Sequence, residues 1–319
     1  MPGAGLNLMN TRSLRPLINI VLFLTALVPL RAAVLQSVYH GDYNGVLTEL
    51  AADGTIVATR NLGAGVIGGL TRDAAGNLYA ATWAGGVGGV AGIVKISTGG
   101  TISTYATLGF GLDPHKLSFA SNGDLLVNVN SGKILRVTPS GGVSEFATGL
   151  NNPIGMAFAA NGDLYVSNLD NTIRRFPLGA NPSGGIGEIF ASGISSPREL
   201  DFDSAGNLYV ASGGTLFRYT PGGIRSIFAS GFTDLNAVGV AANGDVWVGD
   251  YSTQLVSRFS SAGVFLSATL AGPSSTLVAN VASNLAPSAV PDSGPISLLL
   301  GLGLLSLGLV ARGGENRKR

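Results

Sequence analysis

A short pattern of apolar and polar residues returns through the middle of the chain. Its clearest copy is an apolar run at residues 155–158, the turn Asn161-Gly162-Asp163, and a second apolar run at residues 164–166. Asn and Gly tolerate the positive φ angles that a tight turn between two strands requires. The pattern therefore predicts a β-hairpin at each of its copies.

The copies recur at a period typical of repeat architectures. The turn glycines stand 47, 39, 44 and 38 residues apart, at Gly76, Gly123, Gly162, Gly206 and Gly244. A third and a fourth β-rich run follow the hairpins, so each period supplies four strands. Four strands at about this spacing form one blade of a β-propeller. The pattern thus predicts an all-β propeller of four-stranded antiparallel blades.

The two ends of the repeat region are incomplete in a complementary way. Residues 38–43 read as a second strand that lacks its first, and residues 276–282 as a strand with no later partner. Pairing them would complete a split blade, close the ring and leave no unpaired edge. We expect six blades and one propeller over residues 34–283. The blades are expected at 35–62 with 276–282, 66–108, 115–149, 153–192, 197–230 and 236–270.

The geometry of such a ring predicts where a ligand would bind. A blade's first strand starts at the end where its second strand finishes, so the loops at these points surround one mouth of the central channel. This mouth is the predicted ligand-binding face, and the chain offers no convincing set of catalytic residues. The predicted ligand-binding residues are Trp83, His115, Asn152, Arg198, Glu199, Asn236 and Asp250.

The repeats resemble the NHL-type and gluconolactonase/senescence-marker families of six-bladed propellers. The resemblance covers about residues 35–282 and rests on the [Asn/Ala]-Gly-[Asp/Asn]-Leu-Tyr-Val core and on the proline-containing start at residues 152–158. It implies two alternatives: a non-catalytic binding or scaffold module, which we favour with no cofactor, or a metal-dependent lactonase or hydrolase. The second would bind Ca²⁺ through carboxylate and amide oxygens. Its ligands would be Glu199, Asn152, Asn236 and Asp250, although the Asp-Gly pair usual in those relatives does not occur at the matching positions.

One position of the third strand carries a cation in five blades and Glu49 in the first. Either these cations form an anion-binding ring, or they face solvent or a carboxylate of the neighbouring blade, which we favour. They are Lys95, Arg136, Arg175, Arg218 and Arg258.

The first 33 residues have the form of an export signal. Arg12 and Arg15 precede an apolar run at residues 17–30, and Ala32 and Ala33 follow. The alternative is an uncleaved N-terminal anchor. Because the chain has no cysteine, it has neither disulfides nor thiolate metal sites.

A second targeting signal occupies residues 290–319, after a linker at 284–289. An apolar run at 296–311 and a basic tail ending at Arg319 follow a short motif, which is Val290, Pro291, Asp292, Ser293 and Gly294. This arrangement resembles the PEP-CTERM class of sorting signals in its Val-Pro-Asp-Ser-Gly variant. The resemblance implies an exosortase-type processing enzyme and delivery to the envelope, surface or matrix of a Gram-negative bacterium. The alternative is a plain C-terminal anchor, although 16 helical residues span only about 24 Å of a core of about 30 Å.

The two signals also dominate the charge of the chain. The formal net charge is +1, but residues 34–294 hold 12 basic and 17 acidic side chains. Such a body has no basic surface for nucleic acid. The expected partners are the processing enzyme, the membrane through the C-terminal helix before processing, and a polysaccharide, a peptide or another surface protein.

Changing Pro291 and Asp292 together to alanine should leave the precursor unprocessed, because the processing enzyme acts at this motif. The measurement is the size of the protein in a host that carries such an enzyme, beside a matched change of Pro287 and Ser288 in the linker. A product of normal mature size from the first variant would contradict the sorting signal.

Overall fold

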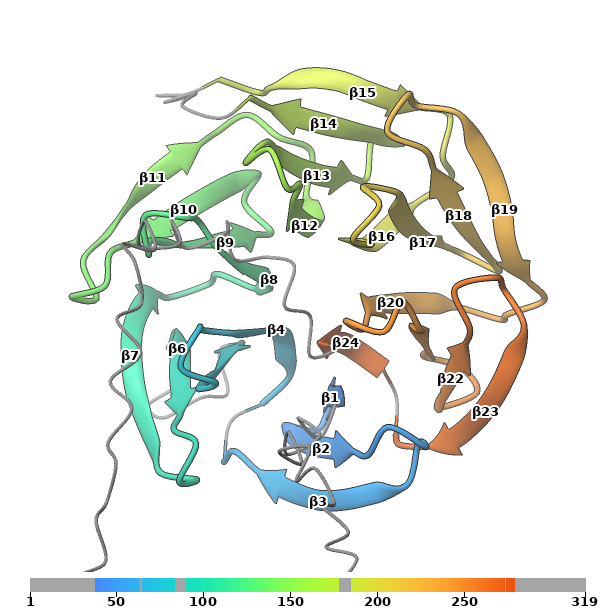
Figure 1. Ribbon diagram of the computed structural model, residues 1–319. Coiled ribbons are helices and arrows are strands. Elements are labelled where there is room, and N and C mark those ends of the chain that lie inside the picture. The colour runs from blue at the N-terminus through green and yellow to red at the C-terminus, as the bar shows by residue number, and fades with distance from the viewer. Residues whose placement is uncertain (1–37, 64, 84–89, 178–184, 273, 279–319) are drawn as a thin grey trace, which may run out of the picture.

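The computed structural model describes residues 38–63, 65–83, 90–177, 185–272 and 274–278, which form a ring of six four-stranded antiparallel sheets (Figure 1). The predicted six-bladed propeller is confirmed. From the channel outward, blade I holds β24 (Ser274–Val278), β1 (Val38–Asp42), β2 (Val46–Leu50) and β3 (Ile56–Asn61). Blade II holds β4 (Ile67–Arg72), β5 (Leu78–Thr82), β6 (Ala91–Ile96) and β7 (Ile102–Gly109). Blade III holds β8 (Pro114–Phe119), β9 (Leu125–Val129), β10 (Lys133–Val137) and β11 (Val143–Ala147).

The other three blades follow the same order from the channel outward. Blade IV holds β12 (Pro153–Phe158), β13 (Leu164–Asn168), β14 (Thr172–Phe176) and β15 (Glu188–Ser192). Blade V holds β16 (Pro197–Phe202), β17 (Leu208–Ser212), β18 (Thr215–Tyr219) and β19 (Arg225–Ser230). Blade VI holds β20 (Leu235–Val240), β21 (Val246–Asp250), β22 (Leu255–Phe259) and β23 (Phe265–Leu270).

Blade I is the split blade that the sequence predicts. Its innermost strand β24 comes from the end of the repeat region and pairs antiparallel with β1, with His40 opposite Leu277 and Gly41 opposite Thr276. The strand starts two residues earlier than expected, at Ser274. Residues 279–282, expected to continue it, lie outside the described residues, as do the predicted terminal signals, the linker and their apolar segments. No helix in the described part of the chain is long and apolar enough to cross a membrane.

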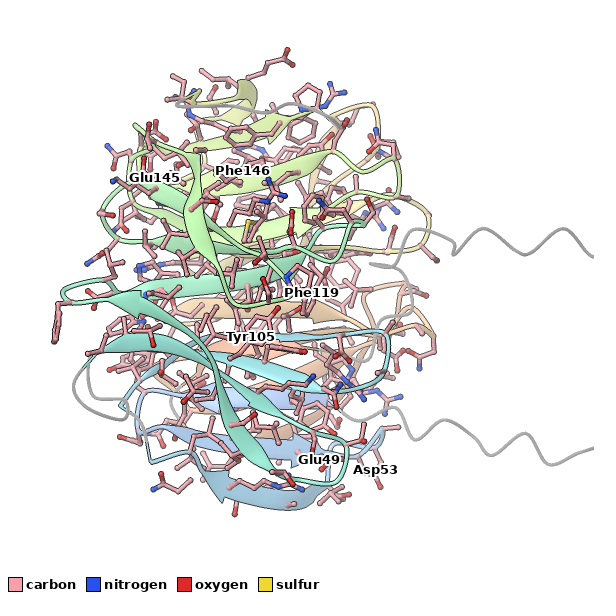
Figure 2. All side chains as sticks on the ribbon, turned by 90° about the vertical axis from the view of Figure 1, so that its left-hand side faces the viewer. Glu49, Asp53, Tyr105, Phe119, Glu145 and Phe146 are labelled. Carbon is pink, nitrogen blue, oxygen red and sulfur yellow. The ribbon has the colours of Figure 1, made fainter. Side chains whose placement is uncertain are left out.

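Each sheet buries its apolar faces against the two neighbouring sheets, and this burial requires the ring to be closed. The described residues contain six clusters of buried apolar side chains, one at each interface between neighbouring blades. In the cluster between blades II and III, Tyr79 packs edge-on against Tyr105 and Phe119, with ring centres 4.9 and 5.0 Å away. Figure 2 shows this side of the ring, where the Tyr105 hydroxyl also donates to the carbonyl of Thr138 in blade III. Each blade is therefore stabilised by both of its neighbours.

The repeated turn motif also encodes a contact within single blades, in blades III, IV and VI. The aromatic residue of the motif lies directly opposite the third-strand cation, as Tyr165 does opposite Arg175 and Trp247 opposite Arg258. The cation also pairs with the carboxylate of the turn, at 2.7 Å between Arg175 and Asp163. Arg136 and Arg258 do the same with Asp124 and Asp245. These carboxylates belong to the same blade, so our expectation of a carboxylate from the neighbouring blade is wrong, whereas the expected exposure to solvent holds for Arg136 and Arg175, whose side chains are 44% and 39% exposed.

The innermost strands approach one another so closely that some positions require glycine. A Cβ atom on Gly155 of β12 would lie 2.4 Å from the carbonyl oxygen of Arg198 and 2.8 Å from Cα of Glu199, both in β16. On β4, a Cβ atom on Gly69 would lie 2.3 Å from the carbonyl oxygen of His115 in β8. Both contacts are with backbone atoms, which cannot move away without shifting a strand.

Gly155→Ala should lower the free energy of unfolding by about 1–3 kcal/mol, the usual cost of forcing extra atoms into a packed interior. The measurement is urea denaturation at equilibrium. Gly222→Ala is the matched control, because a Cβ atom there would have only the Thr220 side chain near it, at 3.8 Å. Equal denaturation midpoints for the two variants would contradict the close approach of β12 and β16.

Candidate functional site

The side chains of the candidate site come from irregularities at the start of the innermost strands. In β12, β16 and β8 the register shifts just after the first proline, so two residues of the inner strand lie opposite one residue of its partner. Single shifts also occur at the start of β4 and β20. Such bulges bend a strand and turn its side chains in new directions. The residues in the bulges are Gly68, His115, Lys116, Ile154, Gly155, Arg198, Glu199 and Asn236.

These bulges surround a pocket of about 140 Å³ at the predicted mouth of the channel. We call it the mouth pocket, and its lining residues come from the starts of inner strands and from the loops after β1, β5 and β13. They are Tyr43, Gly68, Trp83, His115, Lys116, Asn152, Ile154, Leu169, Arg198, Glu199 and Asn236. Six of the seven predicted ligand-binding residues are among them, and Asp250 is not.

Aromatic rings form one wall of the mouth pocket. Trp83 lies between Tyr43 and His115, with its ring centre 5.9 Å from the first and 5.6 Å from the second, in edge-to-face contact. The indole N–H of Trp83 donates to the carbonyl of Pro114 at 2.9 Å, which fixes the orientation of the ring. Tyr251 packs against Tyr43 at 5.1 Å. The wall is thus held in place before any ligand arrives.

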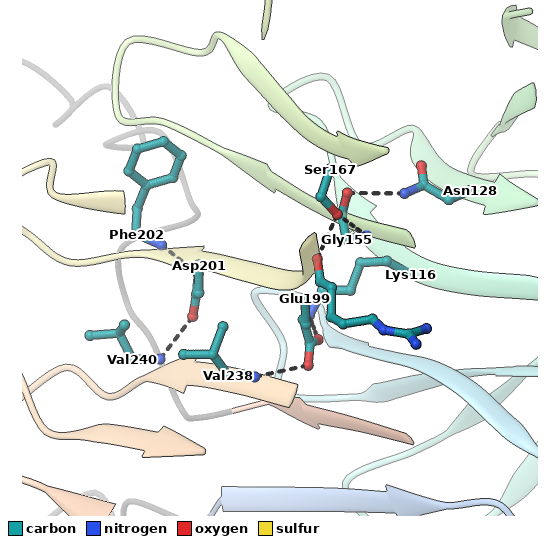
Figure 3. A network of polar contacts seen from close by, with 10 residues as sticks. Lys116, Asn128, Gly155, Ser167, Glu199, Asp201, Phe202, Val238 and Val240 are labelled. Carbon is teal, nitrogen blue, oxygen red and sulfur yellow. Dashed lines mark hydrogen bonds and ion pairs between the residues drawn. The ribbon is translucent and has the colours of Figure 1, made fainter. Parts of the chain in front are cut away.

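A buried ion pair lies at the floor of the mouth pocket (Figure 3). Lys116 of blade III pairs with Glu199 of blade V, and their side chains are 10% and 5% exposed. The pair thus joins two blades that are not direct neighbours, because blade IV lies between them in the ring. The second oxygen of Glu199 accepts the backbone N–H of Val238 in blade VI at 3.2 Å. Glu199 therefore connects three blades.

Further hydrogen bonds extend this connection into what we call the polar belt. Its members are Lys116, Asn128, Gly155, Ser167, Arg198, Glu199, Asp201, Phe202, Val238 and Val240. The Ser167 hydroxyl illustrates its form: it accepts the N–H of Gly155 at 2.7 Å and donates to the carbonyl of Arg198 at 2.5 Å. Asp201 accepts the N–H of Val240 at 2.9 Å. The belt fixes the inner strands of blades III to VI relative to one another.

Several polar atoms of the mouth pocket have no hydrogen-bond partner in the described chain. They are Oδ1 of Asn152, Oδ1 of Asn236 and Nε2 of His115. Asn236 is only 9% exposed, so its unpartnered oxygen is shielded from bulk water. Leaving a buried polar group without a partner costs about 1–3 kcal/mol. A pocket that gathers three such atoms is suited to a ligand with hydroxyl or amide groups.

His115 is neutral at physiological pH. Burial lowers its pKa from 6.5 to about 4, and the nearby Arg198 charge acts in the same direction, while Asp113 and the side chain of Asn152 oppose this shift. Burial likewise lowers the pKa of His40, the other histidine, to about 4, with Asp42 opposing. His40 is fully buried in β1 and does not line the mouth pocket. A His–His acid/base pair is therefore not formed there.

Asp250 lies away from the mouth pocket and has a local role. Its two oxygens accept backbone N–H groups, among them those of Thr233 at 2.7 Å and Thr253 at 2.9 Å. Burial alone would raise the pKa of Asp250, but these backbone donors hold it below its usual value. The side chain thus fixes the loops on either side of blade VI.

The predicted Ca²⁺ ligands do not fit the ion. Glu199 is engaged by the Lys116 ammonium and the N–H of Val238, and the oxygens of Asp250 are engaged by backbone donors. Ca²⁺ takes six to eight oxygen ligands, and an ammonium at the site repels it. Among the described residues, no group of three or more His, Asp or Glu side chains is placed to hold a metal.

Sequence reasoning missed Lys116, Ile154 and Leu169 as lining residues of the mouth pocket. Lys116 was missed because strict alternation along β8 places His115 and Lys116 on opposite faces. The bulge brings both side chains to the pocket. The proline that begins β8, β12 and β16 is the one sequence signal for it, since each of these strands shifts register directly after its proline.

Scans of the sequence against protein-family models and against curated proteins gave no match. Comparison with solved structures gave many. A protein of unknown function from Bacteroides caccae has a TM-score of 0.59 at 16% identity, with 77% of this chain and 99% of that chain covered. A functionally unknown protein from Desulfotomaculum acetoxidans has a TM-score of 0.54 at 14% identity, with 77% and 89% covered.

A third similar structure belongs to a named enzyme. It is a catalytically inactive variant of virginiamycin B lyase from Staphylococcus aureus, solved with quinupristin, with a TM-score of 0.52 at 17% identity. The match covers 75% of this chain and 89% of that chain. Identities this low support a common propeller fold and carry no information on activity.

Acidification from pH 6.5 to 4 should lower the free energy of unfolding through both histidines. The unfolded chain binds protons on them below pH 6.5, whereas the folded chain does so only near pH 4. The slope is about 1.4 kcal/mol per pH unit for each fully shielded group. Asp201 acts in the opposite direction, because burial raises its pKa from 3.8 to about 6 and the folded state then binds the extra proton.

Urea denaturation at several pH values checks this balance. His40→Gln should flatten the loss of stability between pH 6.5 and 4, and Asp201→Asn should steepen it. The comparison uses the slope of the free energy of unfolding against pH. A substitution that lowers this free energy equally at every pH leaves the slope unchanged. Slopes equal to that of the unmodified protein in both variants would show that the two groups titrate as they do in the unfolded chain.

Proposed function

We propose that the protein is an exported binding module of the cell envelope that holds a ligand in the mouth pocket without converting it. The observation that supports this most strongly is the set of unpartnered polar atoms on Asn152, Asn236 and His115. Beside them the Arg198 guanidinium forms no ion pair within the described chain. A ligand would satisfy groups that the protein leaves unsatisfied.

The charged groups of the pocket favour binding over catalysis. A general acid or base works best with a pKa near the working pH. The pKa of His115 is well below that range, and Glu199 is engaged in the polar belt. The site therefore offers hydrogen bonds and one free cation, together with a fixed aromatic wall.

Location at the envelope is the second part of the proposal. It rests on the form of the two terminal segments described above. The ligand would then be a polysaccharide, a peptide or a surface protein met outside the cell membrane.

Asn236→Leu should weaken ligand binding at least tenfold, since it removes the shielded acceptor and fills part of the mouth pocket. The full chain, purified in mild detergent, is screened for binding to arrayed envelope polysaccharides and peptides, and affinities are then measured by calorimetry. Thr104→Leu is the matched control, because Thr104 is exposed on the outer strand β7.

The fate of the ligand separates the two classes of function. The bound ligand should be recovered with unchanged mass after long incubation, with added Ca²⁺ or with EDTA. Conversion to a product that requires a divalent cation and is abolished by Asn236→Leu would instead establish the metal-dependent hydrolase. Equal weakening by Thr104→Leu would show that the ligand does not bind at the mouth pocket.

A further inference from the structure

The mouth pocket contains one cation that the described protein does not neutralise. Lys116 is paired with Glu199, and Arg174, on the strand that leaves the same mouth, is paired with Asp170 at 3.4 Å. Arg198 is partly buried and lines the pocket, yet its guanidinium has no carboxylate partner and no hydrogen bond in the described chain. A guanidinium in a half-buried site is best satisfied by a carboxylate or phosphate, which it binds through two parallel hydrogen bonds.

The other free groups of the pocket are of a different kind. Asn152, Asn236 and His115 line the pocket, each has a buried polar atom without a hydrogen-bond partner among the described residues, and His115 is neutral. These neutral groups exchange hydrogen bonds with hydroxyls. One negatively charged group beside several hydroxyls is the chemistry of an acidic sugar, whereas a peptide backbone supplies only one N–H donor per residue.

The size and the wall of the pocket agree with this chemistry. At about 140 Å³ it is smaller than the 300–1,000 Å³ of a pocket for a drug-sized ligand, so it has room for one ring rather than a chain. Tyr43 and Trp83 supply an apolar surface on one side, against which the C–H face of a sugar ring can pack. The polar groups of Arg198, Asn152 and Asn236 line the same pocket.

We propose, building on the binding function above, that the mouth pocket recognises a saccharide unit that carries a carboxylate, such as a uronic acid at the end of a chain. Its carboxylate pairs with Arg198, and its hydroxyls bind Asn152, Asn236 and His115. Recognition is local rather than long-range, because Asp113 and Asp234 flank the mouth and residues 34–294 carry more acidic than basic side chains. The negative electrostatic potential around the mouth repels a polyanion. Only a carboxylate in direct contact with the Arg198 guanidinium is stabilised.

Calorimetric titration of the full chain in mild detergent tests this with two matched ligands. One is a trisaccharide of galacturonic acid, and the other is its fully methyl-esterified form, which has nearly the same shape without the charges. The free acid should bind at least tenfold more tightly. Added NaCl should leave this preference nearly unchanged, because salt screens repulsion around the mouth as well as attraction inside it.

Two variants assign the preference to one side chain. Arg198→Gln should bring the affinity for the acid down to that for the ester or below it, because the repulsion around the mouth remains, and should leave the ester unaffected. Arg174→Gln makes the same change of charge near the same mouth and should keep the tenfold preference. Asn236→Leu should weaken both ligands.

Other outcomes would contradict the recognition of a carboxylated saccharide. They can be told apart from a result that contradicts ligand binding in the mouth pocket altogether. Equal affinity for the acid and the ester, both weakened by Asn236→Leu, would refute the carboxylate and keep the binding function. Binding of peptides alone, sensitive to Asn236→Leu, would refute the saccharide. If Arg174→Gln and Arg198→Gln reduced the preference for the free acid over the ester equally, the preference would come from long-range electrostatic attraction and not from a contact with Arg198. If neither saccharide binds at millimolar concentration, the inference is wrong.

Discussion

The structure depends on each sheet being buried between two others. A four-stranded blade has two apolar faces, and each of the six buried clusters is made jointly by two adjacent blades, such as Leu47 with Ile67 or Leu126 with Met156. A blade alone would expose both faces to water, so stability comes from completing the ring. The pairing of β24 with β1 is what completes it, and it joins residues more than 230 positions apart in the sequence.

The ring imposes a second constraint near its axis, where the inner strands of all six blades converge. Little space is left for side chains there, as the close backbone approaches at Gly68, Gly69 and Gly155 show. Backbone atoms of β16 fill the space beside Gly155, and the ion pair of Lys116 and Glu199 crosses from blade III to blade V. Breaking a buried pair of this kind by removing one partner typically costs 3–5 kcal/mol, because the other charge stays buried. The floor of the mouth pocket is thus part of what holds the ring together.

This dual role explains why residue type alone is a poor guide to function here. Glu199 and Asp250 have the chemistry of metal ligands, yet their oxygens are used for contacts between strands or loops. The third-strand cations look like a ring for anions, yet Arg175 and Arg258 pair with the turn carboxylates of their own blades, and Arg258 also lies over the ring of Trp247. Arg198, by contrast, sits in the same short strand as Glu199 and is left unengaged. What separates a structural residue from a candidate ligand-binding residue here is whether its polar atoms already have partners in the protein, and not its residue type.

The sequence by itself determined the fold, because a two-residue alternation, turn glycines and a period near 40 residues are local properties that each strand carries independently. Even ring closure was readable, from a missing strand at one end and a spare strand at the other. It also predicted that these residues share one mouth of the channel, and six of the seven line one pocket, since antiparallel strands fix which loops share an end. The tertiary structure alone decided which side chains are already partnered. Lys116 meets Glu199 across 83 positions through bulges that break the alternation, and no local pattern encodes such a contact.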